Sequence, residues 1–218
     1  MNRITAIAAA LVCGLGMSAQ DAASQDEYSE DFLKPAKASS VEVVEAYNNN
    51  VHKLFIGENN YDFSYMVKPS LMSEYCLAYD KEAGELVYKI VTGKNVWSVT
   101  RDGEGQYSAE ETTLKVPEAV GTSLSTLVML ATESSRLFDP ANDVFGLDGV
   151  TYEFTHSNGI TAECWSPRNG NCRQLVDMME TVCQLVKENK ADDIMRLTPS
   201  VYGLINGFLQ VMPGRTLE

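Results

Sequence analysis

Two glutamates and a tryptophan, Glu153, Glu163 and Trp165, have the types and spacing that could do chemistry. The glutamates lie in two segments of alternating polar and apolar residues joined by a short turn. Two carboxylates held close together raise the pKa of one of them, which is how acid/base pairs and glycosidase sites are made. A tryptophan beside them could stack on a sugar ring. These residues raise the hypothesis of a glycan-acting hydrolase; the alternative is an exposed polar sheet face whose carboxylates stay apart in water.

A second group of oxygen ligands lies in the acidic loop predicted over residues 136–149. Asp139, Asn142, Asp143 and Asp148 offer carboxylate and amide oxygens, which calcium prefers. Their spacing differs from that of an EF-hand, which needs alternate acidic positions closed by a glutamate. The three aspartates are therefore weak metal candidates beside the simpler interpretation of a surface loop. No phosphate loop, dinucleotide fingerprint or nucleophile elbow occurs, so the sequence predicts no cofactor.

The cysteines and histidines narrow the chemistry further. Four cysteines follow the N-terminal segment: Cys76, Cys164, Cys172 and Cys183. In an exported protein an even number permits disulfides, and Cys164 with Cys172 is the nearest pair in sequence; the alternative is that all four are buried apolar residues. No two form Cys-x-x-Cys, and neither His52 nor His156 has a metal-ligand neighbour at helical or strand spacing, so redox and zinc motifs have no support.

The register of the hairpin over residues 150–165 decides where the glutamates lie. A two-residue Asn158-Gly159 turn would put aromatic and glutamate side chains on one face. A three-residue loop, Ser157 to Gly159 with a left-handed glycine, instead collects the apolar residues of both strands on one face and the polar residues on the other. Because burial fixes register, we expect the second arrangement, in which Glu153 and Glu163 stand directly opposite each other.

Hydrophobic periodicity predicts the remaining elements. Apolar residues at helical spacing indicate helices that begin at Ser39, at Pro117, near Cys172 and at Thr198. Alternating or β-branched segments predict strands over 63–68, 74–80 and 85–92, and a second hairpin that pairs 96–101 with 107–116. The connections are too short for parallel crossovers. The predicted fold is α+β, an antiparallel sheet of about six or seven strands with the helices packed mainly on one face.

The N-terminus predicts export. Residues 1–19 have a positive start, an apolar stretch and a small-residue exit, as a secretory signal peptide does. The apolar stretch is shorter than the about 20 residues that span a bilayer. A retained anchor, or a lipoprotein acylated at Cys13, are the alternatives. We expect residues 20–38 to be a flexible leader, residues 39–218 to be a single domain, and the protein to be periplasmic or extracellular.

Composition limits the partners. The chain has a formal net charge of −13, which removal of Arg3 with the signal would make one unit more negative. Nucleic acids and anionic membranes both require clustered lysine and arginine, so neither is an expected partner. Gly203 and Gly207, four residues apart in the last predicted helix, could let that helix approach a second copy closely. A homodimer through the C-terminal helix is therefore one hypothesis, beside an unknown ligand or protein.

Two segments of the chain carry a resemblance. The stretches from Phe145 to Phe154 and from Thr161 to Pro167, with the helix that follows, resemble a group of uncharacterised exported proteins of Gram-negative bacteria. The similarity would cover most of Ser39 to Asn189. Its motifs are structural: a glycine turn, a strand, and a Trp-Ser-Pro segment that connects the strand to a helix. The resemblance implies export and an α+β fold, and it implies no activity and no catalytic residues.

Two functions of different class follow from these observations. The first is a non-enzymatic exported binding or interaction module that uses the surface around Trp165 or the terminal helix. The second is a glycan-acting hydrolase that holds Glu153 and Glu163 in a cleft with an aromatic floor. Of the two, the sequence favours the binding module.

Overall fold

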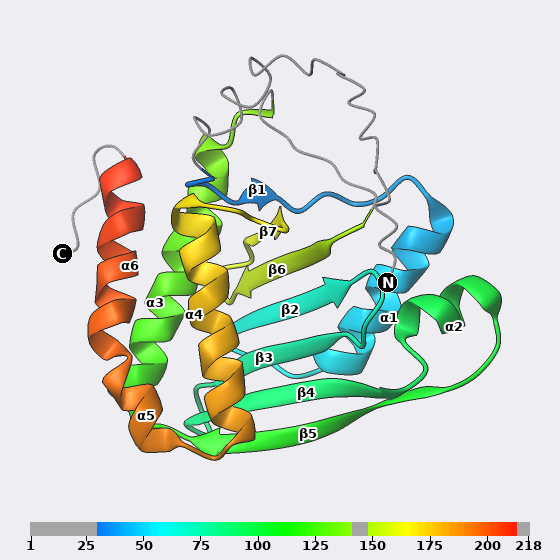
Figure 1. Ribbon diagram of the computed structural model, residues 1–218, viewed down its shortest axis with the longest axis horizontal. Helices are drawn as coiled ribbons and strands as arrows, with labels where there is room; N and C mark the ends of the chain where they lie inside the picture. Colours follow the sequence, from blue (N-terminus) through cyan, green and yellow to red (C-terminus); the bar gives the residue numbers. More distant parts are fainter. Residues whose placement is uncertain (1–29, 141–147, 213–218) are drawn as a thin grey trace, which may run out of the picture.

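A seven-stranded antiparallel sheet forms the centre of the computed structural model, which describes residues 30–140 and 148–212 (Figure 1). The strand order is β1-β7-β6-β2-β3-β4-β5. The strands are β1 (Lys34–Pro35), β2 (Phe63–Pro69), β3 (Tyr75–Asp80), β4 (Glu85–Gly93), β5 (Tyr107–Lys115), β6 (Val150–His156) and β7 (Thr161–Trp165). Every neighbouring pair is antiparallel, as the sequence predicts.

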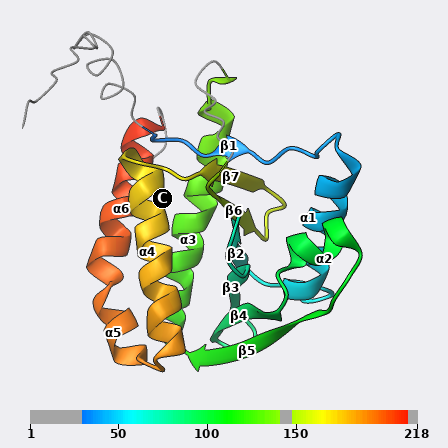
Figure 2. The same cartoon turned by 45° about the vertical axis from the view of Figure 1, so that its right-hand side comes forward.

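The helices divide unequally between the two faces of the sheet. Figure 2, in which the sheet is seen nearly edge-on, shows α3 to α6 on one face and α1 and α2 on the other. The helices are α1 (Glu42–Phe55), α2 (Val96–Asp102), α3 (Glu118–Ser134), α4 (Gly170–Lys187), α5 (Ala191–Arg196) and α6 (Thr198–Val211), with a 3-10 turn η1 (Ser135–Leu137). The predicted α+β fold, with helices mainly on one face, is therefore confirmed. Among the described residues, none of the helices is long and apolar enough to cross a membrane.

Alternation along the strands builds two apolar cores. Tyr65 of β2 points into the larger core under α3 to α6, and its neighbour Met66 points into the smaller core under α1. The larger core joins sheet residues such as Phe154 to Leu175 of α4 and Phe208 of α6, all fully buried. This face carries most of the apolar burial and hence most of the hydrophobic stabilisation.

The β6–β7 hairpin has the predicted register. Glu153 is paired with Glu163, and the backbone N–H of His156 donates to the carbonyl of Ile160 at 3.1 Å. The loop therefore has three residues, and Gly159 within it takes a left-handed φ of 85°. Apolar burial has fixed the register as expected.

One predicted hairpin is wrong. Residues 96–101 form helix α2 instead of a strand, and β5 pairs with β4 directly. Asn95 caps the helix, since its side-chain oxygen accepts from the N–H of Ser98 at 2.8 Å. Gly103, with a left-handed φ of 71°, ends it and donates to the carbonyl of Val99. These two local signals were present in the sequence, but the apolar residues between them imitate a strand.

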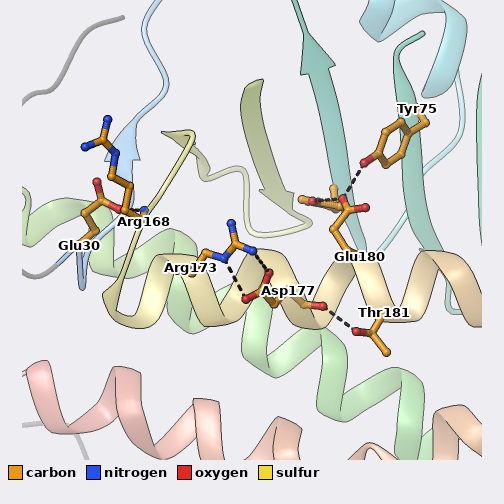
Figure 3. A network of polar contacts seen from close by, with 8 residues as sticks. Glu30, Tyr75, Arg168, Arg173, Asp177, Glu180 and Thr181 are labelled. Carbon is orange, nitrogen blue, oxygen red and sulfur yellow. Dashed lines mark hydrogen bonds and ion pairs between the residues drawn. The ribbon is translucent and has the colours of Figure 1, made fainter. Parts of the chain in front are cut away.

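The leader boundary also needs correction, because the chain joins the fold before residue 39. Lys34 in β1 is paired with Glu163 in β7, and Leu33 is fully buried. The carboxylate of Glu30 accepts from the backbone N–H of Arg168 (Figure 3). The carbonyl of Glu30 accepts from the backbone N–H of Cys172 at the start of α4. Residues 30–36 thus cover the outer edge of β7, which would otherwise be an unpaired strand edge.

Candidate functional site

The two predicted glutamates lie opposite each other on the sheet face that carries α1, and each is held by a lysine. Lys68 Nζ lies 2.8 Å from Glu153 Oε2, and Lys34 Nζ lies 3.6 Å from Glu163 Oε1. The structure therefore brings the two residues together as ion pairs with separate partners.

A pocket of about 600 Å³ opens beside Lys68, where α1, α2, the end of β2 and the segment before β6 meet. Figure 1 shows β2 running towards α1 and α2, which brings its last residues to this corner of the molecule. The pocket is lined by Tyr47, Lys68, Pro69, Ser70, Leu71, Asn95, Trp97, Ser98, Arg101 and Asp148. Its size lies within the range of small-molecule sites, about 300–1,000 Å³.

Two aromatic rings form one part of the pocket lining. Tyr47 and Trp97 meet edge-to-face, with ring centroids 5.3 Å apart and an interplanar angle of 89°. Tyr47 is nearly buried, and Trp97 is partly exposed. Trp97 is the residue that sequence reasoning missed, because its segment was predicted as a strand. The asparagine cap and the glycine C-cap of α2 are the signals that could have found it.

A buried carboxylate holds both rings in place. Glu74 has no exposed surface, and its two oxygens accept from the backbone N–H groups of Val96 at 3.1 Å and Trp97 at 3.2 Å. Tyr47 lies close to this carboxylate, and burial together with the negative charge of Glu74 raises the pKa of the phenol. One side chain just before β3 therefore fixes the start of α2, whose Trp97 ring packs against Tyr47 of α1, so the aromatic lining is preorganised.

The charged residues of the pocket are mostly compensated. Lys68 donates to Asn48 Oδ1 at 3.2 Å as well as to Glu153, and its side chain is only 8% exposed. Arg101 makes a bidentate contact with Asp102, at 2.7 and 3.0 Å. Asp148 is an exposed residue of the lining. The pocket thus presents hydrogen-bonding groups with little net positive charge.

Trp165, predicted as a sugar-stacking surface, is not part of the pocket lining. A Cβ atom on Gly149 would lie 2.5 Å from its indole ring, so the ring packs closely against the glycine backbone. The adjacent segment is joined to the β2 end, since Ser70 Oγ donates to the carbonyl of Gly149 at 2.8 Å. Trp165 therefore supports the segment that carries Asp148.

The predicted metal candidates do not converge in the part of the chain that is described. Asp139 is exposed, Asp148 lines the pocket, and Asn142 and Asp143 lie outside the described residues. Within residues 30–140 and 148–212, no group of three or more histidine, cysteine or acidic side chains could hold a metal ion.

The four described cysteines are free, buried thiols, which corrects the suggested disulfide between Cys164 and Cys172. Burial raises the pKa of the Cys164 thiol well above its ordinary value, and the neighbouring Cys172 adds to the rise. Burial likewise raises the pKa of Cys76 to about 12. A buried thiol with a raised pKa is a poor nucleophile, because the thiolate is the reactive form.

A serine, a histidine and an aspartate meet where the hairpin tip touches α3. Ser125 Oγ donates to Asp62 at 2.6 Å and lies 3.2 Å from His156 Nε2, while the N–H of Asn158 donates to His156 Nδ1. A neutral imidazole whose Nδ1 accepts carries its proton on Nε2, so it faces the serine as a donor. A catalytic triad needs the histidine between serine and aspartate, with its basic nitrogen towards the serine. The cluster therefore fastens the hairpin to α3.

On the opposite face, Glu180 fastens α4 to the sheet. The hydroxyls of Tyr65 and Tyr75 both donate to Glu180 Oε1, at 2.6 and 2.7 Å (Figure 3). Burial and the glutamate raise the pKa of both phenols, so they stay protonated as donors. The pocket beside α4, lined by Asp177, Thr181 and Leu204 among others, does not include these three residues, and we assign them a structural role.

The two glycines of α6 have different surroundings. A Cβ atom on Gly207 would lie 2.9 Å from Asn171 Oδ1, so this glycine serves packing within the chain. A Cβ atom on Gly203 would meet nothing within 4 Å. Only one of the two therefore faces outward, and the homodimer through this helix stays a prediction.

No family model, curated protein or solved structure matches this chain.

Proposed function

We propose that the protein is an exported, non-enzymatic binding protein whose ligand site is the pocket between α1, α2 and the end of β2. The observation that carries this proposal is the pair of aromatic rings, Tyr47 and Trp97, held at the pocket by the buried carboxylate of Glu74. Fixing a binding surface before the ligand arrives lowers the entropic cost of binding. Export is supported by the signal-peptide pattern of residues 1–19.

The ion pairs of the two glutamates support binding over catalysis. Glu153, the acidic residue nearest the pocket lysine, is engaged by Lys68, and Glu163 is engaged by Lys34. The glycan-hydrolase alternative keeps one supporting observation, the direct cross-strand pairing of the two residues. It predicts release of reducing ends from a glycan and loss of that release in both Glu153→Gln and Glu163→Gln.

The two tryptophans of the chain allow a direct test of the binding site. Trp165→Phe leaves Trp97 as the sole indole, and Trp97→Phe leaves only Trp165. Both variants are titrated with separate panels of neutral sugars, amino acids, nucleotides and polyamines, while fluorescence and melting temperature are recorded. We expect at least one class to change the emission of Trp97 and to raise the melting temperature, because a ligand that binds only the folded state stabilises it.

Arg101→Ala is a second variant of the pocket, chosen because Arg101 lines it and its side chain is otherwise exposed. It should weaken the response without lowering the melting temperature of the free protein. A ligand that changes only the emission of Trp165, or that binds Arg101→Ala and Trp97→Ala as tightly as the parent, would place the site elsewhere and overturn the proposal.

Export is tested on the full-length chain expressed in a Gram-negative host. Intact mass of the periplasmic or secreted protein should correspond to cleavage before Gln20. Recovery of an uncleaved chain in the membrane fraction would support the retained anchor instead, and a mass increase from acylation at Cys13 would support the lipoprotein.

A further inference from the structure

We infer that the ligand of this pocket is a neutral saccharide, an inference that rests on the proposed function and narrows it to one chemical class. Three properties of the pocket lead to it: its charge balance, its hydrogen-bonding groups and its aromatic rings.

The charge balance disfavours anions. Each cation of the described lining already faces a carboxylate, Lys68 facing Glu153 and Arg101 facing Asp102. Asp148 adds a further negative charge to the lining, in a chain whose net charge is −13. A phosphate or carboxylate ligand would therefore meet Asp148 in the lining and would have to compete with Glu153 and Asp102 for the two cations.

The hydrogen-bonding groups of the pocket suit hydroxyls. Arg101 has five N–H donors, of which Asp102 uses two, and the capping oxygen of Asn95 is occupied while its amide N–H₂ group is left as a donor. Ser98 offers a hydroxyl and Asp148 offers acceptors only, whereas the hydroxyl of Ser70 is already bonded to the backbone of Gly149. A sugar hydroxyl both donates and accepts, so it can match this mixture of groups without carrying a charge.

The aromatic and apolar parts of the lining suit a ring with a C–H face. Trp97 is partly exposed beside the pocket, and its backbone is fixed by Glu74. An aromatic π face is electron-rich and attracts the weakly positive hydrogens of a C–H surface. Leu71, 84% exposed, adds an apolar contact at the same pocket. A pyranose presents a polar rim and an apolar face, and this pocket offers a partner for each.

The experiment compares matched sugars on Trp165→Phe, in which Trp97 reports alone. Glucose, galactose, N-acetylglucosamine and their short oligomers are titrated by fluorescence and calorimetry, next to glucose 6-phosphate, glucuronate and glucosamine as charged counterparts. We expect a neutral sugar to bind at least about tenfold tighter than its anionic counterparts, and Trp97→Ala to weaken binding at least about tenfold. Asp148→Asn should weaken binding of the neutral sugar by less than Trp97→Ala, since it keeps an acceptor oxygen.

The outcomes separate this inference from the proposed function. If an amino acid, nucleotide or polyamine changes Trp97 emission and no sugar does at about 10 mM, the saccharide inference is overturned and the binding function stands. Tighter binding of glucuronate or glucose 6-phosphate than of the neutral sugars would also overturn the saccharide inference, because it would show that the pocket favours anions. If no compound of any class affects Trp97, the proposed function fails with it. Circular dichroism melts of Trp97→Ala and Trp97→Phe show whether lost binding reflects lost folding.

Discussion

The face of the sheet under α3 to α6 and the face under α1 and α2 differ in how much of their buried contact is apolar. The first is a continuous apolar core that also contains the polar contact of Glu180 with two tyrosines. The second has a smaller apolar cluster that includes Val51 and Phe55, with buried charged groups beside it. Stability therefore depends mainly on one face, and the candidate site is built on the other.

Buried charges organise the α1–α2 face by capping helices. Lys89 Nζ donates to the carbonyl of Phe55 at the C-terminal end of α1, at 2.9 Å, and lies 3.4 Å from Glu111. Glu74 is the negative counterpart at the start of α2, where its carboxylate accepts hydrogen bonds from two backbone N–H groups. The positive charge of Lys89 lies at the C-terminal end of α1 and the negative charge of Glu74 at the N-terminal end of α2, the arrangement that the helix dipole favours. A buried charge is costly unless it is hydrogen-bonded, so these contacts fix where both helices lie.

The largest effect should come from the apolar face. Phe154→Ala removes a fully buried ring from the larger core and should lower the free energy of unfolding by about 3–5 kcal/mol. Thr155→Ala, on the opposite face of the same strand, should cost less than about 1.5 kcal/mol, the contribution of its hydrogen bond to Thr161. Urea denaturation measures both. Equal losses at the two positions would contradict the assignment of stability to one face.

The next effect should come from Glu74. Glu74→Gln keeps one acceptor but turns an N–H₂ group towards a backbone N–H or the Tyr47 hydroxyl, so we expect a loss of about 2–3 kcal/mol and altered Trp97 emission. The matched control is Glu180→Gln, which removes the acceptor charge on the other face and should leave Trp97 emission unchanged. Unchanged emission in Glu74→Gln would show that this carboxylate does not position the indole.

Sequence patterns predicted the apolar face better than the polar one, for a physical reason. The buried stripe of α4, which includes Cys172, Leu175 and Val186, and the register of β6 with β7 both follow from local periodicity. Helix α2 was missed because the apolar residues between its two local caps imitate a strand, and the contact that fixes its start comes from Glu74, more than twenty residues earlier in the chain. A buried carboxylate at a strand end has no periodic signature, and the same holds for the pairing of residues 34–35 with β7.

A smaller effect should appear at alkaline pH. The pKa of Cys76 is about 12 in the folded chain against an ordinary value of 9.0, because the thiol is buried. Above pH 9 the unfolded chain loses a proton that the native chain keeps, so the free energy of unfolding falls as pH rises towards 12. At pH 10.5 this thiol alone should cost roughly 2 kcal/mol.

Urea denaturation at several values between pH 8 and 10.5 measures this slope. Cys76→Ala, in the core under α1, should reduce the dependence of the unfolding free energy on pH. Cys183→Ala, in the core under α4, should also reduce it, because burial raises the pKa of that thiol as well. Stability that does not change across this range, or a slope unaffected by both variants, would contradict the burial of the two thiols.

The smallest predicted effect is a difference in stability loss between substitutions of Glu153 and Glu163. The Lys68–Glu153 contact is shorter and its side chains are less exposed, 8% and 15%, than the Lys34–Glu163 contact, at 17% and 21%. Glu153→Gln should therefore cost more stability than Glu163→Gln, which we expect to cost at most about 1 kcal/mol. Because only Lys68 lines the pocket, Glu153→Gln should also change sugar affinity, and Glu163→Gln should not. Equal loss of affinity in both variants would mean that the glutamates act as a pair, as a hydrolase requires, and would make the pocket part of a catalytic site.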